Sequence, residues 1–93
     1  MRRIEYTTAF RRDYKREKAG QLGRRLDDRL RDVLEHLISD RPLPSQNRDH
    51  TLSGEWVAFR DCHVWPDLVL IYRKLDADVL QLARLGSHSE LFR

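Results

Sequence analysis

The chain has 93 residues, of which 35% are charged and 40% are apolar, and its formal net charge is +3. This length predicts a single domain over residues 1–93 and excludes a six-stranded dinucleotide-binding fold or a repeat array. The lone cysteine, Cys62, excludes an intrachain disulfide and a cysteine-rich zinc site. No stretch approaches the roughly 18 apolar residues that a membrane-spanning helix needs, so we expect a cytoplasmic protein without membrane contacts.

The charge is distributed unevenly along the chain. Residues 1–31 hold eleven basic and five acidic residues, a balance of +6, whereas residues 32–93 hold seven basic and ten acidic ones, a balance of −3. Fifteen of the basic residues are arginines, whose planar guanidinium suits bidentate contact with phosphate. A basic first third favours a polyanion-binding surface, although a solvated helix face rich in arginine produces the same pattern.

The first half of the chain predicts one strand followed by two helices. Residues 3–6 form the expected strand, and Thr7 is suited to cap the helix that follows. Two glycines then end this first helix. Across residues 22–38 the apolar side chains recur at steps of one, three and four, which indicates an amphipathic helix that ends before Pro42.

The second half predicts a meander of three strands. Residues 55–64 alternate in polarity, residues 68–72 form the continuous apolar run of a central strand, and residues 79–85 form the last strand. Residues 87–93 remain as a short tail or helix. The order β-α-α-β-β-β predicts an α+β fold in which a helical hairpin covers one face of an antiparallel sheet.

Three histidines and one aspartate outside the helices are the candidate catalytic residues. His63 ends the first meander strand and Asp67 opens the second, so the tight turn between them places both at one end of the sheet. His88 follows the third strand and, in an up-and-down meander, returns to that end, while His50 precedes the first strand. Histidine titrates near neutral pH, so one ring can accept a proton while another donates one. Taken singly, each histidine is better explained as an exposed loop residue, and Asp67 as a turn residue.

Two strand arginines and a metal site are further candidates beside this cluster. Arg60 and Arg84 lie within predicted strands, where each either marks a sheet edge or directs its guanidinium at a phosphate. The histidines and Asp67 have no spacing that is diagnostic of metal ligands, so we predict no metal and no cofactor. His36, inside the long helix, is interpreted as structural.

Four segments make the chain resemble the YafQ branch of the RelE/ParE toxin superfamily. They are Asp-His-Thr-Leu-Ser-Gly-Glu-Trp at 49–56, Phe-Arg-Asp-Cys-His-Val at 59–64, Pro-Asp-Leu-Val-Leu-Ile-Tyr at 66–72 and Gly-Ser-His-Ser-Glu-Leu-Phe at 86–92. The resemblance extends over nearly the whole chain. It implies a type II toxin that enters the ribosomal A site, contacts ribosomal RNA, and cuts messenger RNA there.

The resemblance also implies partners and roles for residues. A cognate antitoxin is expected to neutralise the protein, and operator DNA to be bound only through the antitoxin complex. One position departs from the family, because the tryptophan that often follows the aspartate is Leu68 here. The family's functional positions carry over onto catalytic His50, His63, Asp67 and His88, with Phe92, Arg60 and Arg84 as substrate contacts.

The chemistry implied is RNA cleavage by the substrate's own 2′-hydroxyl. This reaction needs a base, an acid and a cation near the phosphate. We assign His50, His63 and Asp67 to the base side and His88 to the acid, with exchangeable roles. Two alternatives stay open at this point: a ParE-like toxin that inhibits DNA gyrase by binding alone, and a small nucleic-acid-binding module without activity.

Overall fold

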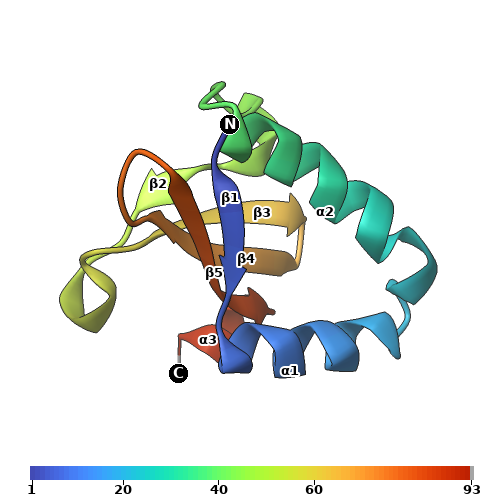
Figure 1. Cartoon of the computed structure of the whole chain (residues 1–93). Coiled ribbons are helices and arrows are strands. Elements are labelled where there is room, and N and C mark those ends of the chain that lie inside the picture. Colours follow the sequence, from blue (N-terminus) through green and yellow to red (C-terminus); the bar gives the residue numbers. More distant parts are fainter. Residues whose placement is uncertain (93) are drawn as a thin grey trace.

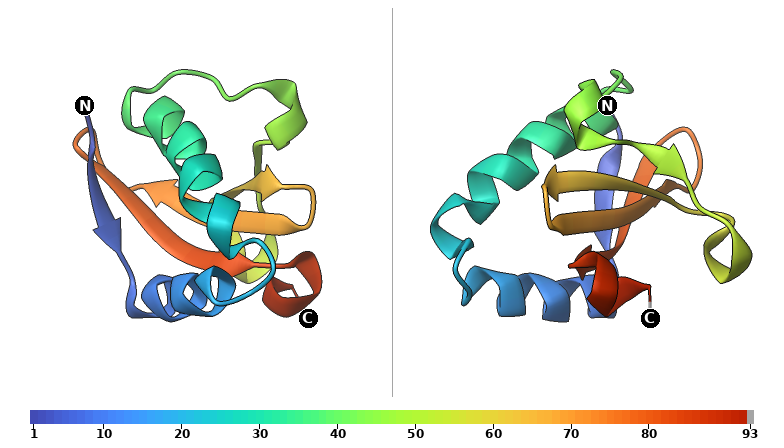
Figure 2. Two further views of the ribbon diagram at one scale, coloured as in Figure 1. Left: turned by 90° about the vertical axis from the view of Figure 1, so that its right-hand side faces the viewer. Right: turned by 180° about the vertical axis from the view of Figure 1, so that it is seen from behind.

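The computed structural model describes residues 1–92. Its five strands form one sheet in the order β1-β5-β4-β3-β2, with α1 and α2 together on one side (Figures 1 and 2). In this part of the chain no helix is long and apolar enough to cross a membrane. The elements in chain order are β1 (Arg3–Tyr6), α1 (Thr8–Lys18), α2 (Gly23–Ile38), the 3₁₀ turn η1 (Ser45–Asn47), β2 (His50–Thr51), the 3₁₀ turn η2 (Gly54–Trp56), β3 (Arg60–Trp65), β4 (Leu68–Lys74), β5 (Val79–Gly86) and α3 (His88–Leu91).

The predicted α+β fold is confirmed, with differences in the strands. Strand β1 pairs in parallel with β5, from Arg3 opposite Val79 to Tyr6 opposite Leu82, so the sheet is mixed rather than purely antiparallel. The short strand β2 adds a further edge beside β3. A polarity pattern over four residues carries no information about strand direction, which is why the parallel pairing was missed.

The first meander strand begins later than predicted. Residues 55–64 were expected to be extended, but Gly54 adopts a left-handed conformation with φ of 66°, and a 3₁₀ turn follows before β3 starts. Trp56 and Phe59 from this loop pack edge to face, with ring centroids 5.2 Å apart. The alternating polarity of residues 55–59 therefore reflects a loop with two partly buried aromatic side chains.

Each face of the sheet has its own apolar cluster. On the helix side, the predicted stripe of α2 and Phe10 of α1 pack against the inward residues of β3, β4 and β5. On the other side, Val69, Ile71 and Ala83 are covered by Leu91 of α3 and by partly buried loop side chains. This second face carries the smaller cluster, and the candidate site lies at one end of it.

Candidate functional site

Strand register brings His63 and His88 together. His63 stands opposite Val69 of β4, and Val69 in turn stands opposite Gly86, the last residue of β5. Ser87 then caps α3, of which His88 is the first residue. The two imidazole rings face each other at a tilt, with centroids 6.1 Å apart.

Phe92 contacts His88 directly. Its ring centroid lies 4.8 Å from that of the imidazole, and its backbone N–H donates to the His88 carbonyl at 3.0 Å. The buried side chain of Leu91 holds this single helical turn on the sheet. Phe92 is therefore placed to orient the His88 ring.

Backbone carbonyls select the tautomers of two histidines. The Nδ1 atom of His63 lies 3.1 Å from the Pro66 carbonyl oxygen, and the Nδ1 atom of His50 lies 2.8 Å from that of Arg48. A carbonyl oxygen only accepts, so each Nδ1 carries the hydrogen. In the neutral rings, the lone pair that can accept a proton is then on Nε2.

Asp61 is a member of the site that the sequence interpretation did not single out. It is paired with His50 across β2 and β3, and one carboxylate oxygen lies 3.1 Å from the His50 Nδ1 atom. The side chain is 0% exposed, and neither of its oxygens has a hydrogen bond within residues 1–92. Burial raises the pKa of Asp61, an effect that positive charge on His50, His63 and His88 opposes. The sequence does contain a signal for Asp61: it lies two residues before His63, which places both side chains on one face of the strand.

Asp67 is exposed in the tight turn between β3 and β4. It directly follows Pro66, whose carbonyl accepts from His63. The neighbouring Leu68, where the family often has tryptophan, is 2% exposed and packs in the helix-side core. The exposed carboxylate of Asp67 therefore lies in the turn that directly follows the β3 segment carrying His63.

Arg60 and Arg84 are both engaged by carboxylates. Arg60 is two residues before the buried Cys62, so both lie on the same face of β3, and His63 lies on the other face. Asp49 binds Arg60 through two nitrogen atoms at 3.2 and 3.3 Å. Arg84 donates to Asp13 of α1 at 2.7 and 3.3 Å. Such ion pairs compensate much of the charge that each guanidinium would offer to a phosphate.

The arrangement is suited to proton transfer. It combines two rings with accepting Nε2 atoms, a third ring at the start of α3, and a buried carboxylate. No group of three or more His, Cys, Asp or Glu residues within the described part of the chain is placed to hold a metal ion.

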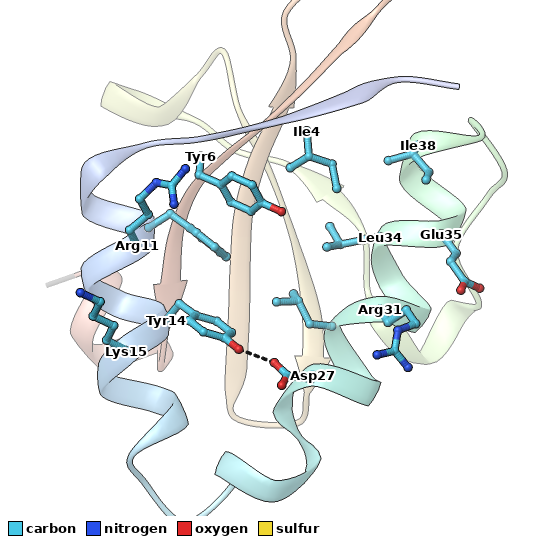
Figure 3. Close-up of a pocket in the computed structure, with 12 residues that line it drawn as sticks. Ile4, Tyr6, Arg11, Tyr14, Lys15, Asp27, Arg31, Leu34, Glu35 and Ile38 are labelled. Atoms are coloured by element: carbon cyan, nitrogen blue, oxygen red, sulfur yellow. Dashed lines mark hydrogen bonds between the residues drawn. The ribbon is translucent and has the colours of Figure 1, made fainter.

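A separate cavity lies between α1, α2 and β1 (Figure 3). It has a volume of about 800 Å³ and a mostly apolar lining that includes Phe10, Leu30 and Leu34. At one side the Tyr14 hydroxyl donates to the Asp27 carboxylate, and none of the four histidines lines it.

Comparisons with known proteins assign the chain to a family. Residues 2–93 match the family described as bacterial toxin of type II toxin-antitoxin system, YafQ. The mRNA interferase toxin YafQ of Escherichia coli K12 is 38% identical over 92 residues, which are 98% of this chain and 96% of the relative. A copper-bound mutant toxin from Helicobacter pylori superposes with a TM-score of 0.86 at 38% identity, covering 99% of this chain and 100% of that one. YafQ in the E. coli DinJ–YafQ complex gives 0.79 at 34% identity, with 100% of both chains covered. The chain belongs to the YafQ family of bacterial toxins from type II toxin–antitoxin systems, as its resemblance to this branch of the RelE/ParE superfamily predicted.

Proposed function

We propose that the protein, acting as one toxin domain over residues 1–93, cuts messenger RNA in the ribosomal A site and so inhibits translation in the cytoplasm. The observation that carries this proposal is the pair of imidazoles of His63 and His88, 6.1 Å apart beside the buried Asp61 carboxylate. Homology to the mRNA interferase toxin YafQ supports it. A protein that inhibits gyrase by binding alone has no need of such a cluster.

The proposed reaction is attack of the RNA 2′-hydroxyl on the adjacent phosphorus. His63 takes the hydroxyl proton on Nε2, since its Nδ1–H is held by the Pro66 carbonyl. The new 2′-oxygen–phosphorus bond displaces the 5′-oxygen, to which protonated His88 gives its proton, leaving a 2′,3′-cyclic phosphate and a 5′-hydroxyl. Each proton transfer contributes about 10²–10⁴-fold to the rate.

The remaining residues of the cluster support these two transfers. Buried Asp61 lies 3.1 Å from the His50 Nδ1 atom and supplies a carboxylate beside the base side of the cluster. Asp67 and His50 complete the base side. Phe92, packed on His88, positions that ring or stacks on a base of the bound strand.

Arg60 and Arg84 are proposed to contact RNA phosphates while held by their carboxylates. A guanidinium has five N–H donors, and Asp49 and Asp13 engage the Nε and one Nη of each. The other Nη can then approach a phosphate without breaking the ion pair. These contacts would bind the RNA backbone through charge-assisted hydrogen bonds.

Two larger surfaces would meet macromolecular partners. The excess of arginine and lysine in β1, α1 and the first half of α2 supports docking on ribosomal RNA, which would leave the ribosome to hold the message. The apolar groove in Figure 3 supports a protein partner, and we propose a cognate antitoxin, as DinJ is for YafQ of E. coli. Operator DNA would be bound only through that complex.

The direct test is to add the purified protein to ribosomes translating a defined message and to map the cuts by primer extension. Cuts within the A-site codon that disappear without ribosomes are expected. An intact message, under conditions where a known ribosome-dependent nuclease cuts, would overturn the proposal. A DNA-damage response with unaffected protein synthesis in expressing cells would point to gyrase instead.

A further inference from the structure

A second groove borders β3 at His63, away from the cavity shown in Figure 3. It has a volume of about 390 Å³ and lies between α2, η1 and the end of β3. Arg29 lines it from α2, Gln46 and Arg48 from the η1 segment, and His63 and Trp65 from β3. The groove therefore borders the segment of β3 that carries His63, the residue that we propose as the catalytic base.

The groove combines an aromatic ring with unpaired positive charge. The guanidinium carbon of Arg29 lies 4.1 Å from the centroid of the Trp65 ring. Within residues 1–92, neither Arg29 nor Arg48 has a carboxylate within ion-pair distance, and no acidic residue lines the groove. These two arginines differ in this respect from Arg60 and Arg84, whose charges are compensated.

The surroundings limit where an anion could extend. A neighbouring hollow of about 200 Å³ also touches Arg29, but Asp32 and Glu35 line it. Negative charge is therefore disfavoured on that side and favoured toward Arg48 and His63. Arg48 is also tied to the catalytic cluster, because its carbonyl accepts from the Nδ1–H of His50.

Trp65 supplies the aromatic surface of the β3–β4 hairpin. It is half-buried, and it stands opposite Leu68, which is buried in the helix-side core. A tryptophan whose ring is stacked by an exposed arginine at the border of a groove offers a platform for a planar ligand. Nucleobases stack on aromatic rings and on guanidinium planes in single-stranded RNA complexes.

We propose that this groove binds the nucleotide of the messenger RNA next to the scissile phosphate. Its base stacks on the Arg29–Trp65 pair and its phosphate contacts Arg48, which holds the strand against His63. The Gln46 amide at the border is available to the base edge. The proposal rests on the proposed nuclease function, because that function makes His63 the reaction centre.

A titration with naked RNA tests the groove apart from catalysis. The probe is a fully 2′-O-methylated hexauridylate, which cannot be cut, added to ¹⁵N-labelled protein. We expect the indole N–H resonance of Trp65, assigned from the Trp65→Phe variant, to shift, and Arg29→Gln to weaken binding at least fivefold. The matched control is Arg73→Gln, because Arg73 lies 4.6 Å from the Phe59 ring outside the groove, and it should bind as the parent does. An unmoved Trp65 resonance, or equal losses from both arginine variants, would overturn the subsite.

A second assay places the groove in the ribosomal reaction. Trp65→Ala should raise the toxin concentration for half-maximal cutting at least fivefold, with the single-turnover rate at saturation within about twofold of the parent. Trp65→Phe should recover most of that loss. Unchanged concentration dependence in Trp65→Ala would contradict the proposal.

The source of the bound base is tested by crosslinking. A 4-thiouridine beside the cut site of the message should crosslink to the groove, whereas crosslinks to ribosomal RNA alone would assign the subsite to the ribosome and contradict the proposal. If the parent cuts no message at all, the nuclease function fails, and the hexauridylate titration still decides whether the groove binds RNA.

Discussion

Asp13 and Asp61 are both 0% exposed, yet the protein surrounds them in opposite ways. Asp13, on α1, accepts from Arg84 at 2.7 Å, from Arg16 at 3.1 Å and from the Leu85 N–H at 3.0 Å. Asp61, on β3, has no hydrogen bond from any of residues 1–92, and its ion-pair neighbour is a histidine. One carboxylate joins α1 to β5 through hydrogen bonds, whereas the other lies without a hydrogen bond beside a histidine ring.

The pKa values of the two groups move in opposite directions. Burial alone would raise the pKa of Asp13, but hydrogen bonds from Arg84 and the Leu85 N–H, with the charges of Arg84 and Arg16, outweigh it and lower that pKa. Burial raises the pKa of Asp61 despite the three nearby histidines. Folding gains nothing from an unsatisfied buried carboxylate, which makes Asp61 a candidate for a role in the site.

The largest expected effect is the loss of RNA cutting when one of the histidines near Asp61 is replaced. His88→Ala and His63→Ala should each lower the rate of message cutting by about 10²–10⁴-fold, because each removes one proton transfer. Both rings are at least partly exposed, so we expect thermal midpoints close to that of the parent. Single-turnover cutting on translating ribosomes and a melting curve measure the two effects. Parent-like cutting by both variants would remove these residues from the mechanism.

Asp13→Asn should be the most destabilising of the aspartate substitutions. Removing one partner of a buried ion pair costs about 3–5 kcal/mol, because Arg84 loses its counter-charge and one of the two accepting oxygens becomes an amide NH₂ group. Urea unfolding measures the loss. The double variant Asp13→Leu, Arg84→Leu should recover part of it, and a loss below 1 kcal/mol in the single variant would show that this pair contributes little.

Asp61→Asn should stabilise the protein, whereas Asp13→Asn should destabilise it. It removes a buried negative charge that has no hydrogen bond, so we expect the free energy of unfolding to rise by up to about 1 kcal/mol at pH 7. The same change should lower the cutting rate at least tenfold, since the imidazolium forms lose a counter-charge. Lower stability with unchanged cutting would mean that Asp61 is structural.

Acidification should separate the two aspartates. The lowered pKa of Asp13 means that its stabilisation is present above the unfolded value of about 3.9 and is lost as the pH falls through the folded value. The raised pKa of Asp61 means that its contribution is full below about 3.9 and is lost as the pH rises through the folded value. From pH 7 to pH 4, the parent should therefore gain stability relative to Asp61→Asn. Toward still lower pH, it should lose stability relative to Asp13→Asn. Parallel pH profiles for both variants would contradict this assignment.

Much of the scaffold could be predicted from periodicity. The apolar steps of α2 and the change to strands after residue 53 follow from spacing alone. The up-and-down order of the meander was enough to expect His63 and His88 at one end of the sheet, where the register places them. The 3₁₀ turn after Gly54 was missed because alternating polarity in a loop is indistinguishable from that of a strand.

The finer features of the site depend on tertiary contacts that no spacing encodes. The tautomers of His50 and His63 are selected by carbonyls of Arg48 and Pro66, whose positions follow from local backbone turns. The engagement of Arg84 by Asp13 joins residues 71 positions apart. The burial of Asp61 depends on how β2, β3 and α3 come together.

We propose that the histidines near α3, at one end of the sheet, cut RNA through its own 2′-hydroxyl. The most direct measurement uses a message with a single 2′-deoxynucleotide immediately 5′ of the scissile phosphate, placed in the A site of programmed ribosomes. The account predicts no cut at that phosphate, while the all-ribose message is cut there to leave a 2′,3′-cyclic phosphate and a 5′-hydroxyl. Undiminished cutting of the deoxy-substituted message would contradict it.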